Sequence, residues 1–237
     1  NGLVPLSKAL QSTVVNKQAA LTSKIDTAFS KAASTYHGNK GWSVCVYPAG
    51  NLVIVNIPIS STTTQQYVMN AITGAWCKFT GIFAHDWVVF GSELYCAGKL
   101  RIGHAWTGVS DYGANIVPRG QQAYSFCGVP GRQKHIKLLR PILTLDGPLT
   151  VSMSLNTDFE ISPFAYSAVA AGVSGDVFDA SDWDSAVWAG DGTIQKDWVS
   201  AASPVCYAAS PRLQCSTNSI TVSWEATVIA FELGSLL

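Results

Sequence analysis

The chain has 237 residues, of which 48% are hydrophobic and 13% are charged, and its formal net charge is zero. The length suits one large all-β domain or two smaller ones, and the balance excludes an intrinsically disordered chain. The apolar runs are too short to cross a bilayer, and no secretory leader is visible. Because the first residue is Asn1, we expect a processed chain or the C-terminal piece of a longer protein.

The charges are unevenly distributed along the chain. Residues 1–140 carry 13 Lys and Arg and 4 Asp and Glu, net +9, whereas residues 141–237 carry 2 and 11, net −9. Such polarity suits head-to-tail or ring packing, although the halves could equally attract each other within one chain. A globular domain has about 25% charged residues, so the low charge predicts that other chains cover much of this surface.

The first predicted element is a helical segment within residues 5–36. Its apolar residues recur at spacings of three, four or seven, which predicts one apolar stripe. The stripe comprises Leu6, Leu10, Val14, Leu21, Ile25, Phe29 and Ala32. The pattern weakens at 14–16, where the segment could divide into two helices, and residues 37–39 should end it.

From Gly41 the period changes to that of β-strands. Three hairpins are predicted, namely 42–47 with 52–57, 66–69 with 75–79, and 87–90 with 93–96. A strand candidate at 99–106 and a loop at 107–113 follow. Short strands at such spacing, with Trp or Tyr in nearly every hairpin, favour a sandwich, a barrel or a propeller.

The second half is also predicted to be β. Strand candidates span 123–126, 135–145, 149–157, 205–208, 213–216 and 220–231, with a turn at 146–148, whereas 161–200 resists assignment. The predicted fold class is mainly β, with propeller-like blades of antiparallel hairpins at 41–118. An N-terminal helical segment precedes them at 1–40, and a β-rich, sandwich-like C-terminal domain follows at 119–237.

The six cysteines form no C-x-x-C pair, which argues against a zinc ribbon or a thioredoxin-type site. Cys45, Cys77 and Cys96 lie in apolar runs and are predicted to be small buried hydrophobic residues. A Cys206–Cys215 disulfide stays open as an alternative.

Motifs for catalysis are nearly absent. The histidines match no zinc-binding spacing, and there is no nucleophile elbow or phosphate-binding loop. They are His37, His85, His104 and His135. A Ser/His/Asp triad stays open because its members need not be neighbours in sequence. We therefore expect no enzymatic activity, no cofactor and no metal.

Two charged clusters are candidate sites. The acidic cluster comprises Asp176, Asp179, Asp182, Asp184, Asp191 and Asp197. It could bind calcium or serve a glycosidase, but it lacks the EF-hand pattern, so a solvated or interface-facing acidic loop is favoured.

The basic run comprises Arg132, Lys134, His135, Lys137 and Arg140. On a regular strand, Arg132, Lys134 and Arg140 would share one face, and His135 and Lys137 the other. These cations could contact DNA phosphates, but charges on both faces of one strand do not suit a protein that reads bases in a DNA groove. We favour a subunit interface or a solvated edge, with Arg132, Lys134, Lys137 and Arg140 as the contacts.

Longer phrases carry a family resemblance. They are QQYVMNAITGAWCKFTG at 65–81, WVVFGSELYCAGKL at 87–100, AWTGVSDYGANIV at 105–117, QQAYSFCGVPGRQKHIKLLRPILTLDG at 121–147 and VSMSLNTDF at 151–159. The chain resembles the C-terminal portion of the tail tube nozzle, or hub, protein of short-tailed bacteriophages (podoviruses). Residues 20–34 and 224–237 are similar to that family too. Where the family has Gly-Gly after its Leu-Tyr hairpin, this chain has Cys96-Ala97-Gly98.

The resemblance implies a virion structural protein that forms a ring, expected to be six-fold, around the DNA ejection channel below the portal and adaptor. The implied partners are copies of itself, the portal and adaptor, tail fibre or needle proteins, and passing double-stranded DNA. Assembly in the bacterial host cytoplasm, without membrane insertion, is implied as well. A basic lining would grip phosphates, so we expect the acidic segment 176–197 to face the lumen or a neighbouring subunit.

Two alternatives remain. One is a glycan-binding or glycan-cleaving receptor-binding tail propeller, since eight Trp and eight Tyr residues could stack on sugars. We expect Trp42, Trp76, Trp87 and Trp106 to be buried, which argues against it. The other is a capsid decoration protein, which would differ only in its place on the virion.

Overall fold

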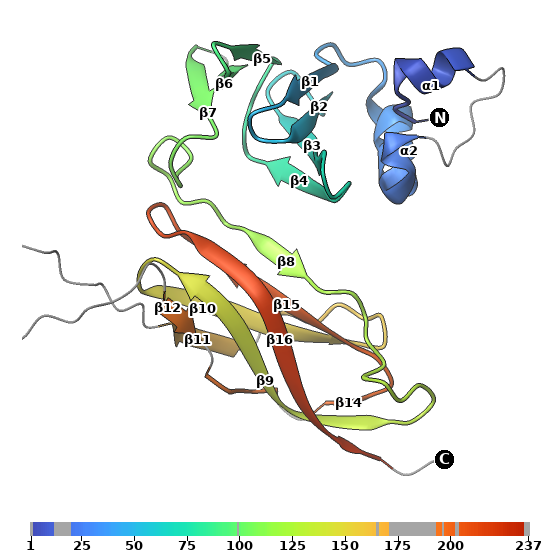
Figure 1. Ribbon diagram of the computed structural model, residues 1–237, viewed down its shortest axis with the longest axis vertical. Helices are drawn as coiled ribbons and strands as arrows, with labels where there is room; N and C mark the ends of the chain where they lie inside the picture. The colour runs from blue at the N-terminus through green and yellow to red at the C-terminus, as the bar shows by residue number, and fades with distance from the viewer. Residues whose placement is uncertain are drawn as a thin grey trace, which may run out of the picture. The chain divides into compact units, whose positions relative to one another are not determined.

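The computed structural model describes residues 2–11, 20–98, 100–164, 166–170, 193–195, 197–201 and 204–234. The described part of the chain is mainly β, with 49% strand and 10% helix. It divides into two compact units, residues 1–107 and residues 108–237 (Figure 1). In the described ranges, no helix has the length and apolar character needed to span a membrane.

Unit 1 contains two antiparallel meanders, in which consecutive strands are neighbours. The four-stranded meander comprises β1 (Ser43–Tyr47), β2 (Leu52–Pro58), β3 (Thr64–Asn70) and β4 (Trp76–Thr80). The three-stranded meander comprises β5 (Asp86–Phe90), β6 (Glu93–Ala97) and β7 (Ile102–Ala105). The three predicted hairpins are confirmed. β7 starts later than predicted because the Gly98 N–H donates to the Arg101 carbonyl at 2.9 Å and closes a turn.

The helices of unit 1 are α1 (Leu6–Gln11), the 3-10 helix η2 (Leu21–Ile25) and α2 (Asp26–Tyr36). α2 ends at the predicted place. Only part of the predicted apolar stripe faces the core: Ile25, Phe29 and Ala32 pack with Val55 and Tyr67 of the sheet. Leu6 and Leu10 are exposed instead, so the prediction of one continuous stripe is wrong at its start.

The four-stranded sheet of unit 1 is covered on both faces. η2 and α2 pack on one face, and the inner face of β5–β6–β7 packs on the other. The second contact brings Ile54 and Val68 together with Trp87 and Leu94. All seven residues of β2 are buried as a result, which explains why its sequence is apolar almost throughout.

A buried polar network ties these two sheets together. Asn56 and Gln66 are paired in register on β2 and β3, and the Gln66 amide donates to Asn56 Oδ1 at 2.8 Å. Asn56 Nδ2 donates to the carbonyls of Gly41 at 2.9 Å and Ala84 at 3.0 Å. Trp87 Nε1, from β5, donates to the same Oδ1 at 3.3 Å. The network therefore fixes the segment before β5 against the first sheet.

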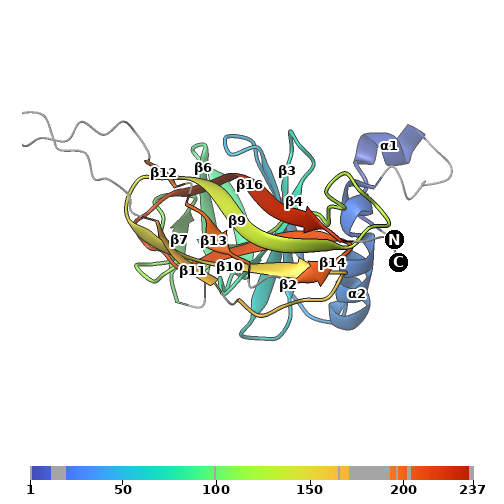
Figure 2. The same cartoon turned by 90° about the horizontal axis from the view of Figure 1, so that it is seen from below.

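Unit 2 contains two sheets (Figure 2). One has the order β11-β10-β15-β8, and in the other β12, β13, β14 and β16 all pair with β9. The strands are β8 (Arg119–Gln121), β9 (Lys134–Leu145), β10 (Leu149–Thr157), β11 (Tyr166–Ala170), β12 (Thr193–Gln195), β13 (Val199–Ser200), β14 (Val205–Cys206), β15 (Ala209–Cys215) and β16 (Val222–Leu233). Both sheets contribute to a single hydrophobic core.

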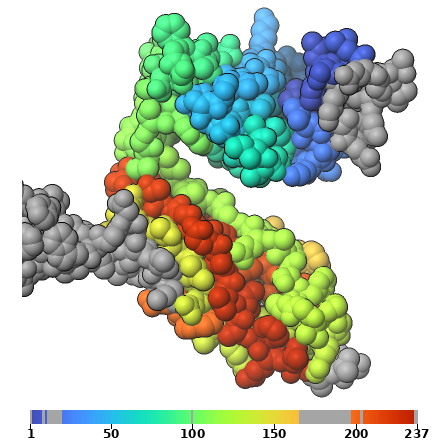
Figure 3. Space-filling model, viewed as in Figure 1, coloured from blue at the N-terminus to red at the C-terminus, as the bar shows by residue number. Residues whose placement is uncertain are grey.

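The long strands of unit 2 confirm the sequence pattern. β9, β10 and β16 lie where strands were predicted, and Ile220, Val222 and Trp224 pack on the core as a common face. The turn at 146–148 connects β9 to β10, which belong to different sheets. The side chains of β16, coloured red, run along the visible face of this unit (Figure 3).

One strand prediction in unit 2 is wrong. Residues 123–126 form no strand, and Ser125 makes only an isolated bridge with Ala209. The left-handed backbone of Cys127 and Gly128, with φ of 49° and 75°, ends the extended conformation there. The strand predicted at 205–208 is confirmed as the shorter β14, and β15 begins at Ala209, earlier than predicted.

Candidate functional site

The predicted basic run lies on β9, where an irregularity in pairing reverses the alternation of side chains. Phe231 of β16 pairs with Ile136, but Ala230 pairs with Leu138, so one residue of β9 is extra. Before this bulge Lys134 and Ile136 are buried, and after it Leu139 is buried instead. Arg140 therefore lies on the outer face and Lys134 on the inner one, and the predicted sharing of a face is wrong.

Lys134 is fully buried and serves the fold. Its ammonium donates three hydrogen bonds to backbone carbonyls, those of Val129 at 2.7 Å, Arg132 at 2.8 Å and Tyr207 at 3.0 Å. A side chain held in this way cannot reach a phosphate or a neighbouring subunit. Its place among the candidate contacts is therefore corrected.

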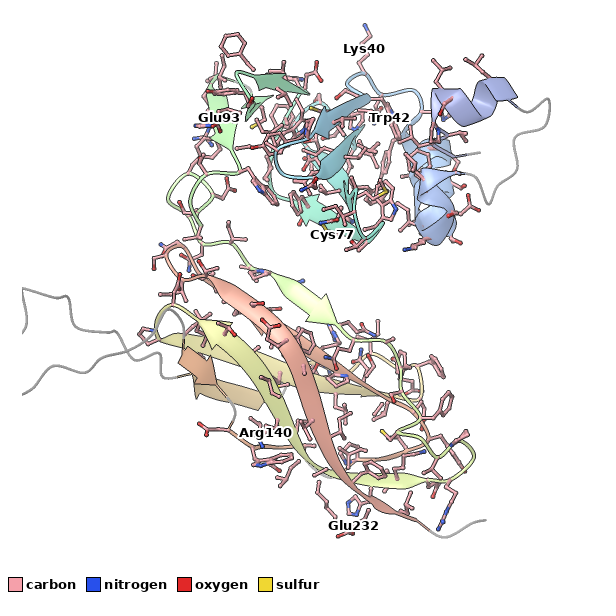
Figure 4. All side chains as sticks on the ribbon, in the orientation of Figure 1. Lys40, Trp42, Cys77, Glu93, Arg140 and Glu232 are labelled. Atoms are coloured by element: carbon pink, nitrogen blue, oxygen red, sulfur yellow. The ribbon has the colours of Figure 1, made fainter. Side chains whose placement is uncertain are left out.

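Other cations of the run have partners within the unit. Arg132 Nη2 donates to the Gly234 carbonyl at 2.8 Å. Glu232 (labelled in Figure 4) pairs with two of them: Lys137 Nζ lies 3.3 Å from Glu232 Oε2, and His135 Nδ1 lies 4.0 Å from the same oxygen. These contacts join β9 to the end of β16.

Arg140 differs from these cations because no carboxylate lies within salt-bridge distance of it in the described ranges. Its guanidinium carbon lies 5.6 Å from the centroid of the Trp198 ring, and its buried Nε–H has no acceptor among the described residues. Val228 is its cross-strand neighbour, and Leu138 precedes it on the same face. Leu138, Val228 and Trp198 are 38%, 41% and 45% exposed. We call these four residues the β9 patch.

Unit 1 presents an exposed apolar surface that the sequence analysis did not identify. On the outer face of β5–β6–β7, the register aligns Val88 with Tyr95 and His104, and Ala97 with Ile102. Val88, Phe90 and Ile102 are 57%, 77% and 78% exposed. The run at 87–90 is apolar on both faces, so its sequence does not show which residues point away from the core. We call this surface, with Asp86 and Glu93, the β5–β7 face.

The polar groups of the β5–β7 face are ordered. His104 Nε2 lies 3.0 Å from Oε2 of Glu93 (labelled in Figure 4), and the His104 ring stacks on Tyr95 at 4.7 Å between centroids. Asp86 Oδ1 accepts a hydrogen bond from the Trp87 N–H at 2.8 Å. In the part of the chain described, no Lys, Arg or His lies within 4.0 Å of the Asp86 carboxylate. The face thus combines apolar side chains with a carboxylate that lacks a cation.

The acidic cluster is mostly outside the described residues, since only Asp197 of its six members is described, and it is exposed. The prediction that this segment faces a lumen or a neighbour stays a prediction. Among the described residues, no group of three or more His, Cys, Asp or Glu could hold a metal ion.

The cysteine and tryptophan predictions are partly confirmed. Cys45 and Cys96 are buried, but Cys77, on β4, is exposed (Figure 4). Cys206 and Cys215 are buried free thiols, so the alternative of a disulfide between them is wrong.

Among the tryptophans predicted to be buried, Trp87 is buried, and Trp42 and Trp76 are half-buried. Trp106 is 55% exposed, contrary to expectation, and its ring stacks with Phe79 at 6.3 Å between centroids. The left-handed backbone of Trp106, with φ of 65°, accompanies the end of β7.

No protein-family model matches this sequence, and no curated protein is significantly similar to it.

Proposed function

We propose that this chain is a structural subunit of a bacteriophage tail, namely part of the nozzle or hub ring through which the genome leaves the particle. The observation that carries the proposal is the β5–β7 face, an uncovered apolar sheet surface in a unit whose other sheet is covered on both sides. Contiguous exposed apolar patches mark sites of protein–protein contact. The sequence segments that resemble the nozzle family indicate the kind of assembly in which this contact would be made.

The sheet arrangement supports the same proposal. A four-stranded and a three-stranded meander packed face to face support the proposal of two consecutive propeller blades, the first with four strands. The two sheets of unit 2, with one shared core, correspond to a β-sandwich. Densely packed sheets of this kind make stiff walls, because protein interiors are poorly compressible.

In this role the chain transforms no molecule, and its partners are other chains. We propose copies of itself in a six-fold ring, the portal and adaptor above, and fibre or needle proteins below. Double-stranded DNA would pass through the ring transiently.

The mass and location of the assembled protein test this proposal. The purified chain should form a closed oligomer in analytical ultracentrifugation, and electron microscopy should show rings with a central channel. An antibody against the chain should label the tails of phage particles from its source. A monomer at all concentrations, or antibody labelling confined to the capsid surface, would contradict the nozzle assignment, and the second result would favour a decoration protein.

A glycan-binding tail component is the second candidate, because Trp106 presents an exposed aromatic ring held by Phe79. Such rings stack on the apolar faces of sugars. A glycan array would test this candidate, with the Trp106→Ala variant as its control. Reproducible binding that this variant loses would favour the receptor-binding role over the nozzle.

A further inference from the structure

We propose that the β9 patch of one copy docks on the β5–β7 face of the next copy, with Arg140 of the first paired with Asp86 of the second. This contact specifies how the copies in the proposed ring are held together, and it rests on the self-association which that function requires.

The two surfaces match in apolar character. Val88, Phe90 and Ile102 of the β5–β7 face are among the more exposed large apolar side chains of unit 1, and they project from one sheet. The β9 patch offers Leu138, Val228 and Trp198 around its single cation. Docking would bury the apolar side chains of both surfaces, and apolar burial is the main favourable term in association.

The two surfaces are also opposite in local charge. The β5–β7 face carries Asp86 and Glu93, whereas the outer face around the β9 patch carries Arg140, Lys137 and His135. Glu93, Lys137 and His135 already have partners on their own faces. Among the described residues, neither Arg140 nor Asp86 has an oppositely charged partner, and a guanidinium pairs well with a carboxylate.

At longer range the whole units attract each other as well. Unit 1 has eight Lys and Arg and three Asp and Glu, net +5, whereas unit 2 has seven and twelve, net −5. Unit 1 of one copy is therefore drawn to unit 2 of another copy in preference to another unit 1. This preference argues against a two-fold contact between two β5–β7 faces.

A protein surface fits the β9 patch better than a phosphate backbone does. Arg140 lies among Leu138, Val228 and Trp198, and the other cations of the run are partnered. Phosphate contacts instead require several free cations along the path of the duplex. The contact we propose is heterologous, because each copy offers one surface from each unit, and such contacts close into rings when the rotation permits.

Complementation between two broken copies tests the contact in the full-length chain. Ile102→Arg disrupts the β5–β7 face, and Val228→Glu disrupts the β9 patch. Ile72→Arg is the matched control, because Ile72 is 75% exposed on the turn between β3 and β4 and belongs to neither surface. Association is measured by sedimentation velocity, and folding by circular dichroism. Leu138→Glu replaces Val228→Glu if the latter chain does not fold.

We expect each variant alone to associate at least tenfold more weakly than the wild type, and the control to associate as the wild type does. An equimolar mixture of the two variants should form dimers only, because it retains one intact contact for each pair of molecules. Asp86→Lys should weaken association, and combining it with Arg140→Glu in the same chain should restore it.

Other results would overturn the proposed contact. If the wild type forms oligomers and both variants do so equally well, these surfaces are not the interface, while the ring itself stands. If Ile102→Arg abolishes association but Val228→Glu leaves it unchanged, the contact is two-fold between β5–β7 faces and not head-to-tail. A wild type that stays monomeric refutes both the contact and the ring. Duplex DNA binding that Arg140→Gln abolishes without affecting assembly would assign Arg140 to phosphate.

Discussion

Lys134 is a cation that the fold uses internally. Replacing it with Met keeps the length of the side chain but leaves the carbonyls of Val129, Arg132 and Tyr207 without their donor. Buried acceptors without a partner are costly, so we expect Lys134→Met to lower the free energy of unfolding by about 2–4 kcal/mol. Urea-induced unfolding followed by circular dichroism measures this change.

Lys137→Met is the control for that measurement. Lys137 lies three residues further along β9 and makes a partly exposed ion pair with Glu232, so its loss should change the free energy of unfolding by less than about 1 kcal/mol. Equal effects of the two substitutions would contradict the internal role of Lys134.

The buried thiol of Cys206 should make the fold less stable at alkaline pH. Burial raises the pKa of its thiol from 9.0 to about 11, and Asp158 and Cys127 add to the increase while Lys134 opposes it. The unfolded chain therefore ionises this thiol first. Its contribution to stability is complete below pH 9 and is lost as the pH rises through 11, by about 2–3 kcal/mol in total.

The comparison with Cys206→Ala isolates this contribution. Unfolding free energies measured between pH 8 and pH 11 should fall less steeply for the variant than for the wild type, whatever their difference at pH 8. Parallel curves would show that ionisation of Cys206 is not linked to folding.

Single residues also show where sequence analysis reaches its limit. Cys45 and Cys96 were correctly predicted as buried, because their neighbours on the strand are apolar. Lys134 could not be recognised as buried, since its partners come from backbone carbonyls at 129, 132 and 207 that no side-chain pattern reveals. Trp106 lies in an apolar run but is exposed, because the left-handed backbone at that residue accompanies the end of the strand.

At the scale of elements, the bulge in β9 decides which cations face outward. A pattern with a period of two predicts faces only while pairing is regular, and an extra residue near Lys137 inverts every position after it. The strand itself was predictable from its apolar residues, whereas the bulge depends on how β16 pairs with it. The basic run was therefore located correctly, but its orientation was not.

The network around Asn56 predicts strong coupling between the two meanders of unit 1. Asn56→Ala would leave the carbonyls of Gly41 and Ala84 without their side-chain donor, and Trp87 Nε1 without its acceptor. We expect a loss of about 2–4 kcal/mol in the free energy of unfolding. Faster amide hydrogen exchange at residues 82–87 would show that the segment has loosened.

Thr62→Ala serves as the control, because Thr62 is exposed in the loop before β3. It should leave the free energy of unfolding within about 0.5 kcal/mol of the wild type, and it should leave the rate of amide exchange at residues 82–87 unchanged. If Asn56→Ala behaves like this control, the network does not hold the second meander in place.

At the scale of the whole molecule, the local pairings were predictable and the longer ones were not. The three hairpins of unit 1 follow from turns such as Gly91-Ser92 between apolar strands. In unit 2, the partners on β9 and β16 lie 77 to 99 residues apart in sequence, and those on β10 and β15 lie 52 to 64 residues apart. Such partners depend on the shared core, which a reading of neighbouring residues does not reveal.

The two units should fold independently, because each has its own core. The clusters around Ile54 and Val55 lie within unit 1, and the cluster around Leu139 lies within unit 2. A protease of broad specificity should therefore cut first in the loop at 107–113, which is rich in left-handed backbone and has few backbone hydrogen bonds.

Fragments 1–107 and 108–237, expressed separately, should each unfold cooperatively and show the β circular dichroism of the parent chain. A fragment that is unfolded alone but folds when mixed with the other would contradict independence. It would also mean that unit 1 and unit 2 complete each other's cores. Weaker association of the Ile102→Arg and Val228→Glu variants would then reflect lower stability of the fold before any change in assembly.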